Sequence, residues 1–364
     1  MEKAFAFIVH PLDIGLVSVA FNEPTLINKK LSLVKKAFEW LPSFKCSEIT
    51  GICSIKGTKI KGHLMYCALL PEQIISLDES FVLDRVVSAG EIARDLGASL
   101  IGVGAYVAQI GKKGVVLARK LQMPVTTGTH YTIWITIKSV LEAAEKIGKD
   151  VTKCNVAIIG ATGKVGKICG QFFSEKASQV TLAARNRSKL EYIREGLLTN
   201  INCKAQVLIE DDIKTAVKNA DISIMSTSVP FPLIDVDELT ARTIVCDISR
   251  PRNVSKKRVE MRRDVLVIDG GIVQPPGDNM DFNFYFGLPK GLAYACMAET
   301  MILTLEEKYE NYSIGGNMIF DKVKEIGALG EKHGFKLAKI RSFGIEIEEE
   351  VYENIRKRAS QTIL

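Results

Sequence analysis

The chain has 364 residues, which is too long for one hydrophobic core of ordinary size and suits two domains of about 100–200 residues each that share an interface. Its composition of 47% apolar, 25% charged and 7% aromatic residues excludes a disordered or fibrous chain. Lys and Arg (48) exceed Asp and Glu (42), but the one dense basic cluster, Lys256–Arg263, has the spacing of a solvated helix face, so we expect no nucleic-acid partner.

The eight cysteines and four histidines show no C-x-x-C pair and no zinc-ligand spacing, so we predict no metal site. The first residues hold one short apolar run, Ala4–Val9, and no run of 18 apolar residues occurs anywhere. We therefore expect neither a signal peptide nor a transmembrane segment, and a reduced, cytoplasmic protein.

The first 130 residues mix strand-like runs with one helical stretch. We predict strands over Gly62–Leu70 and Ser99–Val107, a helix over Ser80–Leu96, and a connecting helix over Tyr131–Ile147. This pattern predicts a separate N-terminal α/β domain over residues 1–150, which would hold the substrate.

The centre of the chain alternates short β-rich runs with helical runs, which predicts a doubly wound parallel sheet of the Rossmann type over residues 151–275. The predicted strands are Val156–Ile159, Val180–Ala184, Ala205–Ile209, Ile222–Met225, Ile244–Ile248 and Val265–Ile268, and the predicted helices are Lys164–Lys176, a helix from Ser188, and Asp211–Lys218.

The last part, residues 276–364, reads as mostly helical, with helices over Leu292–Tyr309, Met318–His333 and Ile345–Ala359. We expect this helical region to pack back on the N-terminal domain. Its many apolar positions leave peripheral contact with a membrane or a partner as the alternative.

A glycine motif of the form G-x-x-G-x-x-G follows the first central strand and opens a helix. The first glycine permits a sharp turn, the second lets backbone approach a pyrophosphate, and the third permits close packing of helix on strand. This context predicts a dinucleotide site made by Gly160, Ala161, Thr162, Gly163, Lys164, Val165 and Gly166.

The end of the second central strand lacks the carboxylate that binds the ribose hydroxyls of NAD. It reads Ala184, Arg185, Asn186, Arg187, and guanidinium groups suit the extra 2′-phosphate of NADP. We therefore predict NADP as the cofactor, with solvated surface arginines as the alternative. Ser226 and Thr227, which follow the fourth central strand, should line the nicotinamide.

A cysteine in the C-terminal region is a candidate nucleophile. On a helical wheel Cys296 falls opposite the apolar stripe of its predicted helix, beside Leu292, Thr300 and Leu303, which favours a cleft over the core. The helix dipole lowers a thiol pKa by less than one unit about one turn into a helix, so Cys296 needs further help, for which Lys290 and His130 are candidates. A packing role for Cys296 is the alternative.

Motifs along almost the whole chain resemble the long-chain acyl-[acyl-carrier-protein] reductases. The most specific are the cysteine segment Ala295-Cys296-Met-Ala-Glu299 and the C-terminal segment from Lys324-Glu-Ile-Gly327 to His333-Gly334-Phe335. The others are Gly62 with Leu70-Pro71-Glu72, Thr126-Thr127-Gly128, Val156 to Gly163, Ala183 to Asn186, and Asp269 to Val273.

This resemblance implies an aldehyde-forming, NADPH-dependent reductase of fatty acyl thioesters, in which Cys296 carries the acyl group before hydride transfer. Its partners would be acyl carrier protein or coenzyme A thioesters and an enzyme that consumes the aldehyde. The family reads T-T-G-N-T-H-T where this chain has Thr126 to Thr132, so His130 stands one place before the family's histidine. His130 is therefore either an acid, base or orienting residue or a structural histidine of the connecting helix.

Two rival interpretations remain open. One is an NADP oxidoreductase resembling shikimate dehydrogenase, although that class uses a lysine and aspartate pair for which the N-terminal domain shows no convincing equivalent. The other is a non-enzymatic NADP-binding sensor that keeps the fold without the chemistry.

Overall fold

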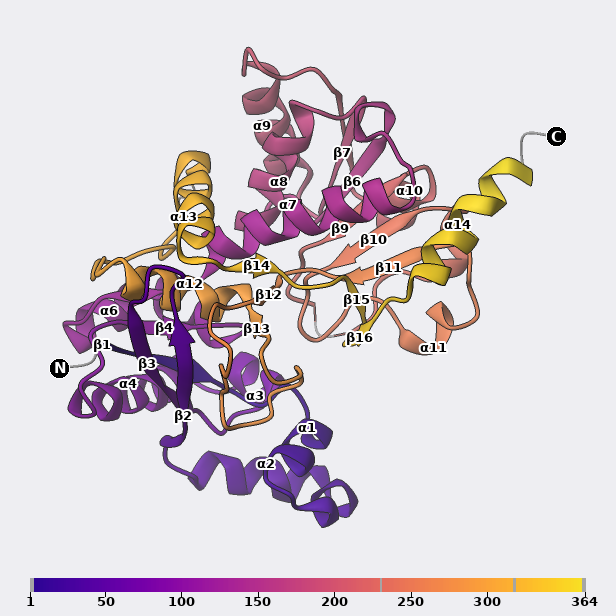
Figure 1. The fold of residues 1–364 in the computed structure, drawn as a ribbon. Coiled ribbons are helices and arrows are strands. Elements are labelled where there is room, and N and C mark those ends of the chain that lie inside the picture. Colours follow the sequence, from indigo (N-terminus) through magenta and orange to yellow (C-terminus); the bar gives the residue numbers. More distant parts are fainter. Residues whose placement is uncertain (1–2, 230, 317–318, 362–364) are drawn as a thin grey trace. The chain divides into compact units, whose positions relative to one another are not determined.

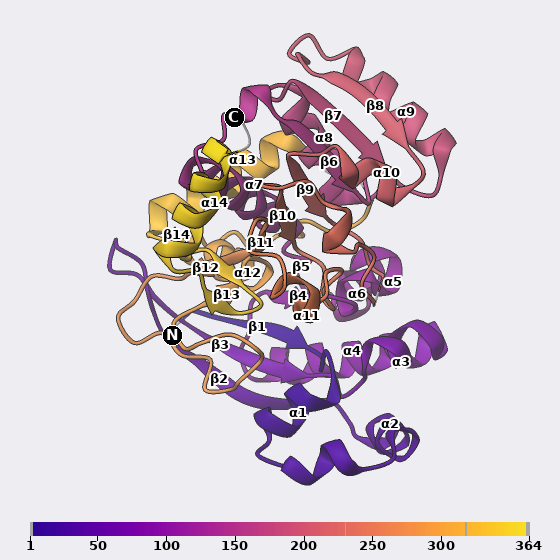
Figure 2. The same ribbon diagram turned by 90° about the vertical axis from the view of Figure 1, so that its right-hand side faces the viewer.

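The computed structural model describes residues 3–229, 231–316 and 319–361. The chain divides into two compact units, and each unit is built from two separate segments of the sequence (Figures 1 and 2). Unit 1 comprises Met1–Thr132 and Ile272–Ala338, and unit 2 comprises Ile133–Gly271 and Lys339–Leu364. The division into domains at residues 150 and 275 stays a prediction.

Unit 1 is built on a five-stranded sheet in the order β2-β3-β1-β4-β5. Four strands are parallel, and the edge strand β2 is antiparallel to β3. The carboxyl ends of the four parallel strands therefore share one edge of the sheet. The strand bounds are β1 Lys3–Val9, β2 Phe44–Cys53, β3 Lys59–Tyr66, β4 Ile101–Val103 and β5 Val125–Thr126.

The two faces of this sheet are covered by helices from distant parts of the chain. Ala6 and Ile8 of β1 face the buried cluster that includes Val82 and Val86 of α4 (Glu79–Asp95). On the other face, α12 (Ala295–Leu305) contacts β1 and β4. The prediction that the last part of the chain packs back on the first is thus confirmed for α12.

The other elements of unit 1 surround this core. A three-stranded antiparallel sheet in the order β13-β12-β14 precedes and follows α12 in the sequence. The bounds are α1 Ile14–Ala20, η1 Pro24–Asn28, α2 Leu31–Trp40, α3 Pro71–Ser76, η2 Val107–Gln109, α5 Ile110–Lys113, α6 Val115–Leu121, β12 Ile272–Gln274, β13 Ala293–Tyr294, α13 Phe320–His333 and β14 Lys336–Leu337.

Unit 2 contains a six-stranded parallel sheet in the order β11-β10-β9-β6-β7-β8, which confirms the predicted doubly wound fold. This is the Rossmann strand order, and the direction of winding reverses between β6 and β9. Helix α7 (Thr129–Lys146) begins in unit 1 and continues in unit 2, because the division falls after Thr132. The bounds of the other elements are η3 Val151–Lys153, β6 Asn155–Ile159, α8 Lys164–Ser174, β7 Gln179–Ala183, α9 Arg187–Leu198, β8 Gln206–Glu210, α10 Ile213–Lys218, β9 Ile222–Met225, η4 Val236–Glu238, β10 Ile244–Asp247, α11 Lys256–Val259, β11 Leu266–Asp269, β15 Arg341–Ser342, β16 Ile345–Glu346 and α14 Glu349–Gln361.

Several predicted bounds are wrong at segment ends. In the run 62–70 the strand ends at Tyr66, and Leu70 is the N-cap of α3. In the run 99–107 only Ile101–Val103 is strand, because residues 105–106 form a turn and Val107 begins η2. Residues 345–346 pair with β15, so the last helix begins at Glu349. Met318, the predicted first residue of α13, lies outside the described residues. Within the described chain, no helix is long and apolar enough to cross a membrane.

Candidate functional site

Cys296 is the second residue of α12 and lies in the first turn, where backbone N–H groups have no partner within the helix. The predicted helix start at Leu292 is wrong, because Ala293 and Tyr294 form β13 and pair with β12. The thiol is therefore at the positive end of the helix dipole and not a full turn inside the helix.

Cys296 also differs from the rest of α12 in its exposure. All other residues of the helix are buried, whereas Cys296 is half-buried and forms no disulfide. The predicted division into an apolar stripe and an open side is thus wrong: Thr300 and Leu303, expected beside Cys296 on the open side, are buried.

Two glycines bring the carboxyl ends of neighbouring strands against Cys296. A Cβ atom on Gly104, just after β4, would lie 3.2 Å from the Cys296 sulfur. A Cβ atom on Gly128, just after β5, would lie 2.2 Å from the Cys296 Cα atom, and Gly128 has a positive φ of 67°. Cys296 therefore lies at the carboxyl edge of the sheet, where open α/β sheets bind ligands.

A buried carboxylate joins the Gly128 loop to α12. Glu299 accepts hydrogen bonds from the Thr126 hydroxyl and, at 2.8 Å, from the backbone N–H of Tyr131. Burial raises the pKa of Glu299 above its ordinary value, although these hydrogen bonds lower it. Glu299 lies about one helical turn after Cys296. Because both of its partners donate, its carboxylate fixes the loop that carries Gly128 to α12.

His130 is the second residue of α7 and is buried. Its Nδ1 atom lies 2.5 Å from the Ser313 hydroxyl, which also accepts a hydrogen bond from the His130 backbone N–H at 3.0 Å. The ring packs edge-on against Tyr312. These contacts bind the start of α7 to the 312–313 loop, and a part for His130 in the chemistry stays a prediction.

Lys290, the other predicted neighbour of Cys296, forms an ion pair with Asp281 at 2.8 Å. Its side chain is largely exposed, with 66% of its surface accessible. A cation that is paired with a carboxylate and hydrated stabilises a thiolate poorly.

His10, which follows β1 at the same sheet edge, was not expected from the sequence to belong to this site. Its Nε2 atom accepts a hydrogen bond from the Tyr106 backbone N–H at 3.2 Å, and its Nδ1 lies 2.9 Å from the Pro11 carbonyl. Burial lowers the pKa of His10 to about 4, so the ring is neutral near pH 7. The neutral ring holds the loop that begins at Gly104.

In unit 2, the predicted glycine turn joins β6 to α8. Gly160 has a positive φ of 86°, and a Cβ atom there would lie 2.7 Å from the Ser226 carbonyl oxygen. At Gly166 a Cβ atom would lie 2.5 Å from the Gly160 carbonyl oxygen. Gly160 thus makes the sharp turn and Gly166 the close helix packing that the motif predicted.

The first turn of α8 is suited to an anion. Its N-cap residue is Gly163, which has no side chain to accept from the backbone N–H groups. By contrast, α9 and α10 are capped by the side chains of Asn186 and Asp212. The residues of this turn therefore fit a pyrophosphate, which would take the place of the missing cap.

Arg185 and Arg187 stand in different surroundings after β7. Arg187 lies 3.5 Å from both Asp211 and Glu191, while Arg185 is an exposed residue between the strand and the N-cap Asn186. Asn186 uses its side-chain oxygen to cap α9. Arg185 is thus the better placed of the two arginines for a phosphate.

Ser226 and Thr227 stand at the carboxyl end of β9, next to the glycine turn. The Ser226 hydroxyl donates to the Ile159 carbonyl at 2.8 Å, and the Thr227 hydroxyl donates to the Asn253 side chain at 2.6 Å. Asn253 is held in turn by Asp247 at the end of β10, which accepts its backbone N–H at 2.8 Å. The sequence did not point to Asn253, because Thr227, whose hydroxyl its side chain accepts, lies 26 residues earlier.

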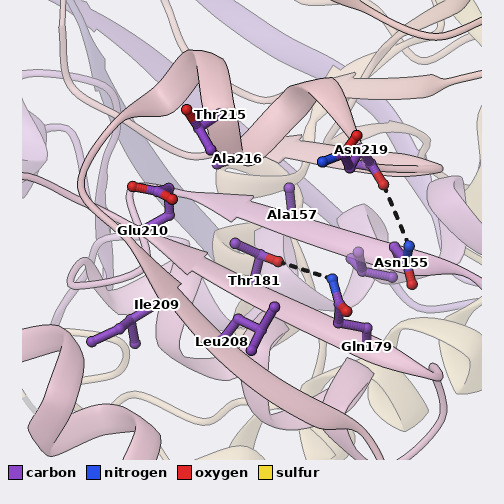
Figure 3. A pocket seen from close by; sticks show the side chains of 12 residues that line it. Asn155, Ala157, Gln179, Thr181, Leu208, Ile209, Glu210, Thr215, Ala216 and Asn219 are labelled. Atoms are coloured by element: carbon purple, nitrogen blue, oxygen red, sulfur yellow. Dashed lines mark hydrogen bonds between the residues drawn. The ribbon is translucent and has the colours of Figure 1, made fainter.

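A hollow on the α10 side of this sheet is a different feature (Figure 3). It measures about 130 Å³, below the 300–1,000 Å³ of ordinary small-molecule sites. Figure 3 shows its amides paired locally, Gln179 with Thr181 and Asn155 with the Asn219 carbonyl. None of the predicted cofactor residues lines it, so we assign it no role.

Comparison with known proteins gives relatives for the central part and for the whole chain. Residues 142–269 match the model of the shikimate/quinate 5-dehydrogenase family. Over 304 residues the chain is 26% identical to the long-chain acyl-[acyl-carrier-protein] reductase of Synechococcus elongatus, covering 79% of this chain and 86% of that protein.

Two further relatives are longer than this chain. Aminotransferase PigE of Serratia sp. is 26% identical over 97% of this chain, and glutamyl-tRNA reductase of Natronomonas pharaonis is 28% identical over 53%. The chain covers only 42% and 40% of these two proteins. The chain is therefore a distant relative of NAD(P)-dependent oxidoreductases and carries a Rossmann-type NAD(P)-binding domain.

Proposed function

We propose that this chain reduces a fatty acyl thioester to the fatty aldehyde with NADPH, through an acyl group bound to Cys296. The observation that carries this proposal is the placement of Cys296, a half-buried thiol in the first turn of an otherwise buried helix and at the carboxyl edge of a sheet. The likeness to a long-chain acyl-[acyl-carrier-protein] reductase over 86% of that protein supports it.

In the first step, the Cys296 thiolate attacks the carbonyl carbon of the thioester and the bond to the carrier sulfur breaks. The carrier leaves as a thiolate, which takes up the proton released when Cys296 ionised. The N–H groups at the start of α12 favour both the thiolate and the negative charge that develops on the carbonyl oxygen. Gly104 and Gly128 have no side chains, so the loops after β4 and β5 can lie directly against Cys296 and hold it at the sheet edge.

NADPH supplies a hydride when it is bound, and Gly160, Gly163 and Arg185 are the residues proposed to hold its phosphates. The role of Cys296 in this step would be to leave the reduced acyl carbon as a thiolate, which would release the aldehyde and restore the free thiolate. A free fatty aldehyde is reactive, so we expect a second enzyme to consume it.

The test is an intact-mass measurement of the full chain after incubation with palmitoyl thioesters in the absence of NADPH, with acyl carrier protein and coenzyme A as separate arms. We expect a mass increase of one acyl group in the wild type and in Cys203→Ser, whose thiol is also half-buried. Cys296→Ser should show no increase.

An acyl adduct that persists in Cys296→Ser would contradict the proposal. So would aldehyde formation on adding NADPH to a wild-type protein that never carries an adduct, because this outcome indicates direct reduction of the free thioester. The arm that labels faster identifies the carrier.

A further inference from the structure

Exposed apolar side chains are concentrated in the segment of residues 19–41, which includes η1 and α2. Twenty large apolar side chains are exposed among the described residues, and seven of them lie in this short segment. Isolated exposed apolar residues are ordinary, but a cluster usually marks a surface that something else covers. The seven are Val19, Phe21, Ile27, Leu31, Leu33, Trp40 and Leu41.

Helix α2 carries apolar side chains on two opposite sides. Its inner side, Val34 and Phe38, packs in a small buried cluster with Val17 and Leu70. Leu33 and Trp40, seven residues apart and 64% and 74% exposed, lie on the outer side. Packing within this protein explains why the residues of the inner side are apolar, but it does not explain the apolar residues of the outer side.

The outward position of Trp40 is fixed by the backbone on both sides of it. Arg85 donates to the Leu41 carbonyl at 2.8 Å and also to the Glu39 carbonyl. Gln73 donates to the Lys35 carbonyl at 2.9 Å. The end of α2 is thus anchored, and the exposed indole does not result from a frayed helix.

Lysines accompany the exposed apolar side chains of this segment. Lys36 lies on the same side of α2 as Trp40, with its ammonium 5.7 Å from the centre of the indole ring. Lys29 and Lys30 immediately precede Leu31. The fourth lysine of the segment, Lys35, is paired with Glu72 at 3.9 Å, and the segment has two glutamates, Glu23 and Glu39. Lysine is depleted at the centres of protein interfaces, whereas Lys with Trp and Leu is typical of helices at a lipid surface.

We propose that residues 19–41 dock this protein on the surface of an anionic lipid bilayer. Leu33 and Trp40 enter the interfacial layer, while the lysines contact the acidic headgroups. This docking does not depend on the reaction proposed above, because it uses neither Cys296 nor the glycine turn.

The test measures sedimentation of the full chain with vesicles of phosphatidylglycerol and phosphatidylcholine, and with phosphatidylcholine alone. We expect binding to the anionic vesicles that falls at high salt, and at least about tenfold weaker binding by the double variant Leu33→Ser/Trp40→Ser. The matched control is Tyr192→Ser/Ile201→Ser, which removes side chains of higher exposure (76% and 97%) from unit 2 and should bind like the wild type.

A second readout follows Trp40 directly. The chain has two tryptophans, so Trp134→Phe leaves Trp40 as the single indole, and its emission should shift to shorter wavelength with anionic vesicles only. Equal binding by the Leu33→Ser/Trp40→Ser variant, or no binding by the wild type, would overturn the proposal.

Two other partners would also overturn it. Dimerisation of the wild type without lipid, lost in the double variant, would indicate a second copy of the chain. Binding of acyl carrier protein without lipid, lost in the same variant, would indicate the carrier. The assays contain no thioester and no NADPH, so their outcome is separate from that of the acyl-adduct test.

Discussion

Arg185 is the residue on which the proposed preference for NADPH depends. A guanidinium that binds a phosphate forms charge-assisted hydrogen bonds worth about 1.5–3 kcal/mol. Arg185→Ala should therefore raise the Kd for NADPH at least about tenfold and change the Kd for NADH little, as measured by cofactor fluorescence.

Arg187→Ala is the matched control, because the Arg187 guanidinium already lies 3.5 Å from both Asp211 and Glu191. It should weaken NADPH binding less than Arg185→Ala does. If Arg185→Ala weakened NADPH and NADH equally, the phosphate assignment would be wrong.

The neutral ring of His10 makes stability depend on pH. Its pKa is lowered from 6.5 to about 4 in the folded chain, so the unfolded chain binds the proton more tightly. The stabilisation is complete above pH 6.5 and is lost as the pH falls toward 4. The shift corresponds to roughly 3 kcal/mol.

Urea unfolding of the wild type and of His10→Gln at several pH values tests this difference. The free energy of unfolding of the wild type should fall by up to about 3 kcal/mol more than that of the variant between pH 6.5 and 4. Parallel pH profiles for the two proteins would show that His10 does not titrate in this way.

The residues around Cys296 show why only part of a functional site can be predicted from the sequence. The glycine motif is local, so Gly160 and Gly166 could be assigned roles before the fold was known. The Cys296 surroundings combine distant segments: Thr126 and Glu299, which hydrogen bond, are 173 positions apart. No local pattern links such pairs, and His10 and Gly104 were missed for the same reason.

At the scale of elements, the start of α12 was misjudged because pairing between strands decided it. Leu292 to Tyr294 have apolar spacing that suits a helix, but Tyr294 pairs with Ile272, which is 22 positions earlier. The predicted apolar stripe and open side of this helix were wrong too. Almost every residue of α12 is buried, so the helix has no polar face from which the direction of the core could be predicted.

The loop after β5 packs directly on the backbone of α12, which gives a test with a close control. Gly128→Ala should lower the free energy of unfolding by about 3 kcal/mol or more, because the added Cβ would lie 2.2 Å from the Cys296 Cα atom. Gly148→Ala, at nearly the same φ but with open space around it, should cost only about 1 kcal/mol.

Thermal unfolding compares the two alanine variants, and the alkylation rate of Cys296 reports on the position of its thiol. We expect the alkylation rate to change in Gly128→Ala and to match the wild type in Gly148→Ala. Equal destabilisation by the two substitutions would mean that the loop moves away from α12 at little cost.

At the scale of the whole molecule, the fold of unit 2 could be predicted and that of unit 1 only in outline. All six strands of the unit 2 parallel sheet follow one another in the sequence, separated by helices or short loops, so local patterns suffice. The sheet of unit 1 is formed by the first 126 residues, and α12, residues 295–305, covers one of its faces. Sequence periodicity does not show which helix packs on which sheet.

This interrupted arrangement also sets an order of events on the ribosome. Residues 133–271 emerge as one continuous stretch and can complete the parallel sheet of unit 2 as soon as β11 is made. The sheet that begins at Lys3 is synthesised before that of unit 2, yet one of its faces stays uncovered until α12 leaves the exit tunnel, which happens after the whole unit 2 sheet has been made. The unit 1 sheet therefore precedes the unit 2 sheet in synthesis but completes its core later.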